Sequence, residues 1–348
     1  MIKALSRILL IVCLLTTHFL FAQNNQKVID SIEHVMTSQK DSILVMSYNE
    51  LTWQYRLVDR EKSIIYGNKA IELGRRINFL KGIGQAYNDL GIIFFDKENY
   101  DSAIALYKLA MGIRKKLNDE KGIAKLYNKI GIVYQKQGVF DKALENQFNS
   151  LKLFEKFSDD IGVSYSLNNI GIIHQNMGQY KDAAKFLEQS IAIKEKIKDN
   201  YGIAGSYVNL SNIYVLEKQF STAEKYYLKA IEISRQLKDK EYLANALNNL
   251  GTQYTTTKQF DKAIPLINES YALRDSLKDT KGMVSCLNNL GEIFIQQKQY
   301  DTAFSILTKG IMAGRLRVLP KKLKASTWSR PTFIPYFWVL TIGGEADP

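Results

Sequence analysis

Apolar residues recur along the chain at the three- and four-residue spacing that places them on one face of an α-helix. Leu90, Ile93 and Phe94 follow this spacing within residues 84–97, and a similar run covers residues 101–117. The pattern therefore predicts two amphipathic helices over these two ranges. Because the same pattern continues along most of the chain, we expect an all-α protein.

The helical pattern repeats every 40 residues. A small residue marks one position of six successive units: Gly91, Gly131, Gly171, Ser211, Gly251 and Gly291. An alanine follows in each unit: Ala103, Ala143, Ala183, Ala223, Ala263 and Ala303. We expect these small residues where the two helices of one unit cross closely. A two-helix unit cannot bury both of its faces alone, so the units are expected to stack.

Aspartates mark the expected starts of five first helices: Asp119, Asp159, Asp199, Asp239 and Asp279. A carboxylate at this place can accept hydrogen bonds from the exposed backbone N–H groups of the first turn. Its negative charge also suits the positive end of the helix dipole. The aspartates therefore predict N-terminal helix caps.

These positions together resemble the tetratricopeptide repeat. The residues that carry the resemblance in one unit are Tyr87, Leu90, Gly91, Phe94, Ala103, Tyr107 and Ala110. The usual unit has roughly 34 residues, whereas the longer unit here, without a terminal proline, is similar to the long-helix repeats of kinesin light chains. The resemblance covers about Gly82 to Arg317. It implies a right-handed superhelical solenoid of helix-turn-helix repeats, in which the first helix of each unit lines a concave groove.

Residues 1–22 have the form of a secretory signal peptide. Lys3 and Arg7 make a basic start, and an apolar run follows that ends at Phe21, with a cleavage site after Ala22. The run is shorter than the ~20 residues that a membrane span needs. We therefore expect an exported protein, located in the periplasm or at the surface of a Gram-negative bacterium.

Three further parts follow: a capping helix over 23–45, a solenoid of one degenerate and six clear repeats over 46–318, and an atypical basic and aromatic tail over 319–348. The tail region, beginning after Gly314, holds four of the five prolines. It is open to interpretation as a membrane-surface segment, as a terminal cap, or as out-of-frame translation. The abrupt change in composition favours the last interpretation.

The formal charge of +12 is uneven, because basic residues without acids gather at the start of the tail. The repeats themselves mix lysine with aspartate and glutamate. Such a mixture is typical of a solvated surface and not of a nucleic-acid interface. We expect no nucleic-acid partner, and membrane association only through the tail or through a missing C-terminal half.

Asparagines recur at two adjacent positions of the first helices, which the resemblance places in the groove. The candidate groove residues are Asn88, Asn128, Lys129, Asn168, Asn169, Asn209, Asn248, Asn249, Asn288 and Asn289. An amide can pair with both the C=O and the N–H of a peptide. The resemblance implies that such asparagines hold the backbone of an extended ligand. Alternatively, they bond between adjacent first helices and fix the superhelical pitch. The two roles are compatible.

Residues that would indicate catalysis are scarce. His18 lies in the signal segment, His34 stands alone, and His174 takes the place of a core aromatic such as Phe94. No pair has the spacing of metal ligands, and neither a phosphate-binding loop nor a nucleophile elbow is present. We therefore expect no enzyme activity, no metal and no cofactor.

The sequence thus predicts an exported interaction module that binds a peptide or protein segment in its concave groove. An alternative comes from the N-terminal stretch 41–74, which, followed by these repeats, resembles the sensor half of certain bacterial signalling receptors. On that interpretation the chain is the sensor ectodomain of a truncated membrane receptor, such as a histidine kinase. Sequence alone does not identify the ligand.

Overall fold

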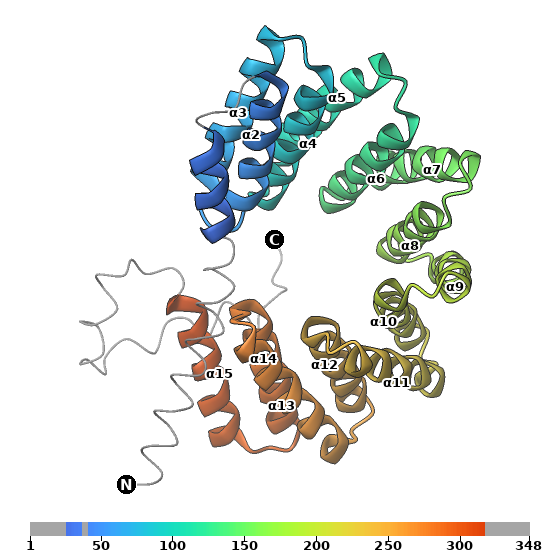
Figure 1. Ribbon diagram of the computed structural model, residues 1–348. Helices are drawn as coiled ribbons and strands as arrows, with labels where there is room; N and C mark the ends of the chain where they lie inside the picture. The colour runs from blue at the N-terminus through green and yellow to red at the C-terminus, as the bar shows by residue number, and fades with distance from the viewer. Residues whose placement is uncertain (1–25, 37–40, 317–348) are drawn as a thin grey trace, which may run out of the picture. The chain divides into compact units, whose positions relative to one another are not determined.

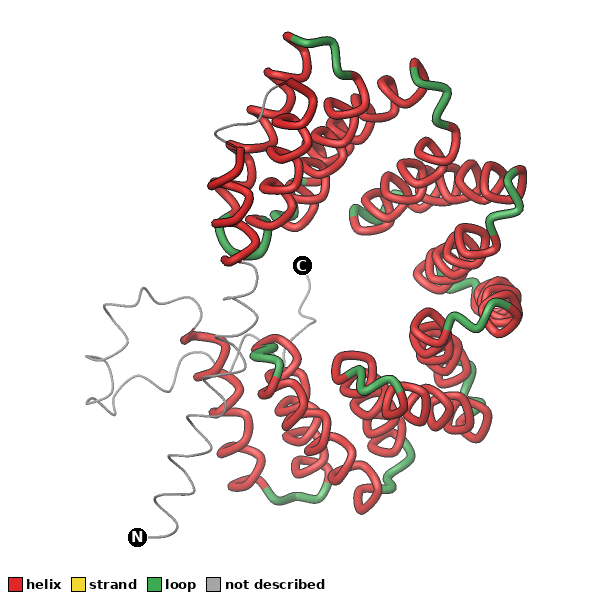
Figure 2. Tube along the Cα trace, in the orientation of Figure 1, coloured by secondary structure: helices red, strands yellow, loops and turns green. Residues whose placement is uncertain are grey.

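The computed structural model describes residues 26–36 and 41–316, so the predictions for the signal peptide and the tail lie outside the described residues. The chain forms two compact units, of which the first ends at Ile213 and the second begins at Tyr214. Within the described ranges all regular structure is helical (Figures 1 and 2), which confirms the all-α prediction.

The first unit contains a helix over 26–36 and the helices α2 (Asp41–Tyr55), α3 (Arg60–Arg76), α4 (Leu80–Asp96), α5 (Tyr100–Lys116), α6 (Glu120–Lys136), α7 (Phe140–Lys156), α8 (Asp160–Asn176) and α9 (Tyr180–Lys196). Helix α10 (Asn200–Leu216) begins in this unit and ends in the second. The second unit continues with α11 (Phe220–Gln236), α12 (Lys240–Thr256), α13 (Phe260–Ser276), α14 (Thr280–Gln296) and α15 (Tyr300–Leu316).

Consecutive helices pack as antiparallel hairpins, for example α4 with α5 and α8 with α9 in the first unit, and α12 with α13 in the second. From α3 onward each helix has 17 residues, and three residues connect it to the next helix. Two helices with two such connections account for the 40-residue period. In each hairpin, the helix that comes first is called the A helix and its partner the B helix.

The connections share one backbone turn. At the end of α4, Glu98 has a positive φ of 60°, its N–H donates to the backbone O of Phe95, and the N–H of Asn99 donates to the backbone O of Phe94, both at 2.9 Å. This is the Schellman arrangement, which satisfies the last carbonyls of the helix. Glycine occupies the left-handed position at Gly138 and Gly178, whereas several other turns place lysine there.

The aspartate caps are confirmed. The side chain of Asp119 accepts from the N–H of Gly122 at 2.8 Å, and Asp159 accepts from Gly162 at 3.0 Å. The same contact recurs at Asp199, Asp239 and Asp279. The predicted start of the helix at residue 84 was wrong, however, because α4 already begins at Leu80. Glycines at the start of this segment lower its helix propensity, and packing of the hairpin outweighs that cost.

The predicted close crossing of the two helices within a hairpin is confirmed at Gly171. A Cβ atom at this position would lie 2.8 Å from Cγ of Leu187 and 3.1 Å from the backbone O of Ala183. Leu187 and Ala183 are completely buried. A side chain at position 171 would therefore force α8 and α9 apart.

Adjacent hairpins in each unit fit by complementary size. A large residue near the end of a B helix faces a glycine in the first turn of the next A helix, as with Arg114 and Gly122, and Phe154 and Gly162. Arg274 and Gly282 repeat this contact in the second unit. Serine hydroxyls add hydrogen bonds within and between hairpins: Ser150 donates to the backbone O of Ala124 at 2.9 Å within one hairpin, and Ser166 on the next hairpin donates to the hydroxyl of Ser150 at 3.2 Å.

The helix over 26–36 covers the N-terminal hairpin. Ile29 is fully buried and packs with Leu51 and Tyr55. The carboxylate of Glu33 accepts hydrogen bonds from the hydroxyls of Tyr55 at 2.9 Å and Tyr66 at 2.6 Å. These contacts fix the helix against α2 and α3.

Two glycine-to-alanine substitutions are expected to change stability in opposite directions. Gly171→Ala should lower the free energy of unfolding by ~1–3 kcal/mol, because its Cβ meets a backbone carbonyl that cannot rotate away. Gly112→Ala, on the exposed side of α5 with no atom within 4 Å of its Cβ, should raise it by ~0.5–1 kcal/mol through helix propensity alone. Urea denaturation of both variants measures the two changes. Equal effects would contradict the close crossing.

Candidate functional site

All predicted groove residues lie near the middle of A helices. Asn88 is on α4, Asn128 and Lys129 are on α6, and the remaining candidates lie on the later A helices α8, α10, α12 and α14. Their exposure differs: Asn88 and Asn248 are buried, Asn288 is exposed, and the others are half-buried. The structure therefore places the candidates in corresponding positions without making them equally accessible.

These side chains form hydrogen bonds between successive A helices. In the first unit, Lys129 Nζ donates to Asn88 Oδ1 at 2.6 Å, and the Nδ2 atoms of Asn169 and Asn209 donate at 3.4 Å to the Oδ1 atoms of Asn128 and Asn168. In the second unit, Asn289 Nδ2 donates to Asn248 Oδ1 at 2.9 Å. Each bond links residues 41 positions apart. The bonds show that the alternative role of the asparagines, in bonding adjacent A helices, exists in the structure. Contact with a ligand stays a prediction.

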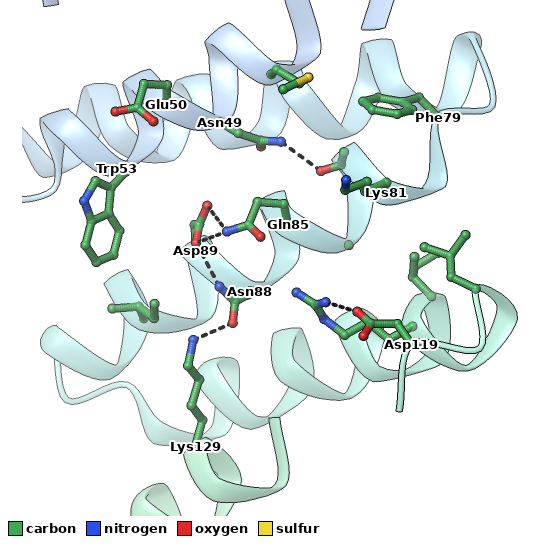
Figure 3. A pocket seen from close by; sticks show the side chains of 17 residues that line it. Asn49, Glu50, Trp53, Phe79, Lys81, Gln85, Asn88, Asp89, Asp119 and Lys129 are labelled. Atoms are coloured by element: carbon green, nitrogen blue, oxygen red, sulfur yellow. Dashed lines mark hydrogen bonds and ion pairs between the residues drawn. The ribbon is translucent and has the colours of Figure 1, made fainter. Parts of the chain in front are cut away.

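A cavity of about 1050 Å³ lies beside this series of bonds in the first unit (Figure 3). Its walls come from the A helices α2, α4 and α6 and from the end of α5. Apolar side chains form much of the wall: Met46, Trp53, Phe79, Ile92, Ile113 and Leu117. Of the predicted groove residues, Asn88 and Lys129 line it. The cavity thus combines an apolar wall with polar groups.

Sequence reasoning did not select Glu50, Trp53, Gln85 or Asp89 as site residues, although all four line the cavity. Glu50 and Trp53 belong to the degenerate first repeat, in which the residues 48–51 precede the matching residues 87–90 by 39 positions and not by 40. Asp89 occupies the second position of the asparagine pair. The replacement of asparagine by aspartate at this repeated position could have identified Asp89 as a candidate site residue from the sequence.

Asp89 and Lys129 bring opposite charges to the cavity wall. Asp89 is 5% exposed and accepts from Gln85 Nε2 at 2.8 and 2.9 Å and from Asn88 Nδ2 at 2.8 Å. Burial raises the pKa of Asp89, while these hydrogen bonds and the charge of Lys129 oppose the rise. Burial lowers the pKa of Lys129 to about 8, against the attraction of Asp89.

A lysine that is more deeply buried than Lys129 lies elsewhere in the first unit. Lys194 is 2% exposed, and its Nζ donates to the hydroxyl of Ser206 at 2.7 Å and to the backbone O of Gly202 at 3.3 Å. The same Nζ lies 4.7 Å from the ring centroid of Tyr165. Burial lowers the pKa of Lys194 to about 8, and the charge of Asp199 opposes the shift.

His174 is half-buried: its ring stacks on Phe186 at a centroid distance of 5.3 Å, and its Nδ1 lies 2.6 Å from Gln179 Oε1. Among residues 26–36 and 41–316, no group of three or more histidine, cysteine, aspartate or glutamate side chains could hold a metal ion. No helix in those same ranges is long and apolar enough to span a membrane. The expectations of no enzyme activity and no cofactor stay predictions.

Comparison with known proteins identifies the repeat. Family models described as tetratricopeptide repeat match residues 84–121, 122–196, 202–276 and 242–311. No curated protein matches the chain.

Many solved structures are similar to the chain, including the following three. A signal transduction ATPase with a tetratricopeptide repeat sensor, from Pyrococcus horikoshii, has a TM-score of 0.65 and 17% identity over 92% of this chain and 49% of that chain. A Rap protein complexed with Competence and Sporulation Factor has a TM-score of 0.61 and 16% identity, over 85% and 94%. The Rap conjugation gene regulator of plasmid pLS20, in complex with the Phr* peptide, has a TM-score of 0.57 and 14% identity, over 86% and 96%. At these identities the likeness shows the fold alone.

The hydrogen bonds between A helices predict unequal roles for two equivalent asparagines. Asn248→Ala should lower the free energy of unfolding by about 1–2 kcal/mol, because Asn248 is 7% exposed and accepts from Asn289. Asn288→Ala, at the exposed equivalent position of the next repeat, should change it by less than ~0.5 kcal/mol. Chemical denaturation of the two variants tests the difference. If both variants unfold like the wild type, the bonds do not stabilise the stack.

The buried lysines predict an alkaline rise in stability. Lys194 has an ordinary pKa of 10.5 when unfolded and about 8 when folded, so between these values the unfolded chain holds a proton that the folded chain lacks. Stability therefore rises with pH in this window, by about 1 kcal/mol per pH unit for one such lysine. Buried tyrosines with raised pKa values, such as Tyr227, reverse the trend above pH 10. Denaturation of wild type and Lys194→Met at pH 7.5, 8.5 and 9.5 should show a flatter profile for the variant. An identical slope would rule out titration of Lys194.

Proposed function

Because the chain belongs to the tetratricopeptide-repeat family, we propose that it is an interaction module that binds an extended segment of a peptide or protein along its A helices. Two of the similar structures, the Rap protein with Competence and Sporulation Factor and the pLS20 regulator with the Phr* peptide, contain such ligands. They support a peptide as the kind of partner and leave its sequence open.

The cavity in the first unit is the observation that carries the proposal. Ligand pockets of proteins commonly enclose ~300–1,000 Å³ and combine apolar walls with a few polar groups. The cavity at α2, α4 and α6 has a volume at the upper end of this range, about 1050 Å³. That volume suits several consecutive residues of a peptide. Apolar walls from Trp53 and Ile92 would bury side chains, while Asn88 and Gln85 provide polar groups beside them.

We further propose that the module is exported, as the signal-like segment 1–22 supports. Mass spectrometry of the periplasmic protein tests this proposal, because export should shorten the chain by these residues.

The sensor ectodomain of a membrane receptor remains the alternative assignment, supported by the sequence of residues 41–74. Both assignments require the same ligand-binding step.

Selection from a random peptide library with the full chain tests the proposed function. We expect enriched peptides with dissociation constants in the micromolar range, and Ile92→Glu should weaken them at least ~10-fold by placing a charge in the apolar wall. Ile132→Glu is the matched control, because Ile132 is half-buried at the equivalent position of α6 and does not line the cavity. A library that yields no binder, or equal losses for the two variants, would contradict peptide binding at this cavity.

A further inference from the structure

Four polar side chains of the cavity wall already donate hydrogen bonds within the protein. Asn49 Nδ2 donates to the backbone O of Gly82 at 3.0 Å, and Lys129 Nζ donates to Asn88 Oδ1 at 2.6 Å. Gln85 and Asn88 both direct their amide N–H groups to the carboxylate of Asp89. These four side chains on α2, α4 and α6 therefore direct N–H groups to acceptors within the protein.

Acceptors remain at the same place. Asn49 is 7% exposed and lines the cavity, and its buried Oδ1 has no hydrogen-bond partner among the residues that the structure describes. Glu50 is exposed on the wall, and only its Oε1 receives the side-chain N–H of Gln54, at 2.7 Å. A ligand that fits this part of the wall must bring hydrogen-bond donors, because the carboxylates of Glu50 and Asp89 line it.

One unpartnered donor in the wall has a different origin. Arg114 Nε is buried without a partner, but Arg274 Nε in the second unit is buried without a partner as well. Both arginines pair with the cap aspartate of the next A helix, Arg114 with Asp119 and Arg274 with Asp279. The unpartnered Nε is thus a property of this repeated ion pair and not of the cavity.

The negative charge at this end is incompletely compensated. The charge of Glu50 adds to burial in raising the pKa of Asp89, so the two carboxylates act on each other across α2 and α4. Lys129 provides one positive charge against them. A cation from a ligand would offset the desolvation of Asp89 and the repulsion from Glu50.

An aromatic ring stands beside the two carboxylates. Trp53 is 44% exposed, and the guanidinium of Arg56 lies 4.4 Å from its ring centroid. The charge of Arg56 is itself paired with Asp96 at 3.3 Å. Figure 3 shows Glu50, Trp53 and Asp89 at one end of the cavity, and Phe79, Lys81 and Asp119 at the other. An exposed tryptophan next to carboxylates is a combination that binds guanidinium and ammonium groups.

We propose that the end of the cavity formed by Glu50, Trp53 and Asp89 binds the basic side chain, arginine or lysine, of the peptide that this module recognises. The proposal rests on the proposed function and makes it more specific. The carboxylates accept the N–H donors of the side chain, and Trp53 covers its apolar stem. The apolar wall between the two ends receives the neighbouring residues of the peptide.

The experiment compares peptide selection by the wild type with selection by Glu50→Gln/Asp89→Asn, using one random heptapeptide library. Wild type should enrich arginine or lysine at one position, and the double variant should lose this enrichment. Glu292→Gln is the control, because Glu292 is an exposed carboxylate on α14, far along the chain from the cavity residues. It should select the same peptides as wild type. Thermal unfolding of each variant verifies its fold. If the double variant does not fold, Glu50→Gln alone replaces it, because this substitution changes only an exposed side chain.

The best arginine peptide is then resynthesised with citrulline, which keeps the shape and removes the charge. Binding should weaken about tenfold or more for wild type and by less than twofold for the double variant. Enrichment without a basic residue, enrichment of acidic residues, or equal binding of the citrulline peptide would overturn the basic-side-chain proposal and leave peptide binding intact. A library without any binder would overturn the proposed function itself.

A free guanidinium compound tests whether the bound cation is a peptide side chain or a small organic molecule. Agmatine should compete with the arginine peptide at least ~100-fold less tightly, because it lacks the neighbouring residues that the apolar wall buries. If agmatine binds as tightly as the peptide, the ligand is a small organic cation and the assignment to a peptide side chain is wrong.

Discussion

Each hairpin depends on its neighbours, because two 17-residue helices cannot bury both faces by themselves. One repeated position of the B helices shows this dependence. Met111, Leu151, Ile191 and Ile231 are at most 9% exposed and Tyr271 is half-buried, whereas Ile311 on α15 is 52% exposed. No further hairpin follows α15 within the described part of the chain. Covering one such side chain contributes ~1.5–3 kcal/mol, so much of the stabilisation lies between repeats.

The same dependence explains why the repeats are so regular in size. The glycine at position 122 admits the side chain of Arg114, and the glycine at position 162 admits the ring of Phe154. Position 242 carries tyrosine, and the B-helix residue that corresponds to Arg114 is there the small Ser234. At these positions a large residue on one helix is thus accompanied by a small residue on the other. The pair Gly74 and Gly82 is an exception, because both are glycine and the side chains of Val45 and Phe79 lie closest to Gly82.

The regular part of this arrangement could be predicted from the sequence. Local helix propensity and side-chain size predict the period, the aspartate caps and the close crossing at Gly171. These signals recur in each repeat. The turns were less visible, because most left-handed positions carry lysine, asparagine or another side chain in place of glycine. The sequence suggested bonds between the asparagines only as one of two roles, and it gave no sign of the cavity, because both depend on which residues of different repeats meet in space. Trp53 and Glu50 also stand in a repeat whose register differs from the others.

Stacking of the repeats requires equivalent residues on successive A helices, whereas selective ligand binding requires residues that differ between them. An amide can bond to the backbone of a peptide whatever the side chains of that peptide are. The equivalent hydrogen bonds of Asn128 and Asn168 could likewise form in any stack of these repeats. Selectivity must come from positions where one repeat differs from the next. Asp89 and Lys129 interrupt the asparagine series at neighbouring repeats, and both line the cavity. The two residues that break the asparagine series thus lie at the cavity. A ligand that distinguishes this module from other stacks of repeats would bind there.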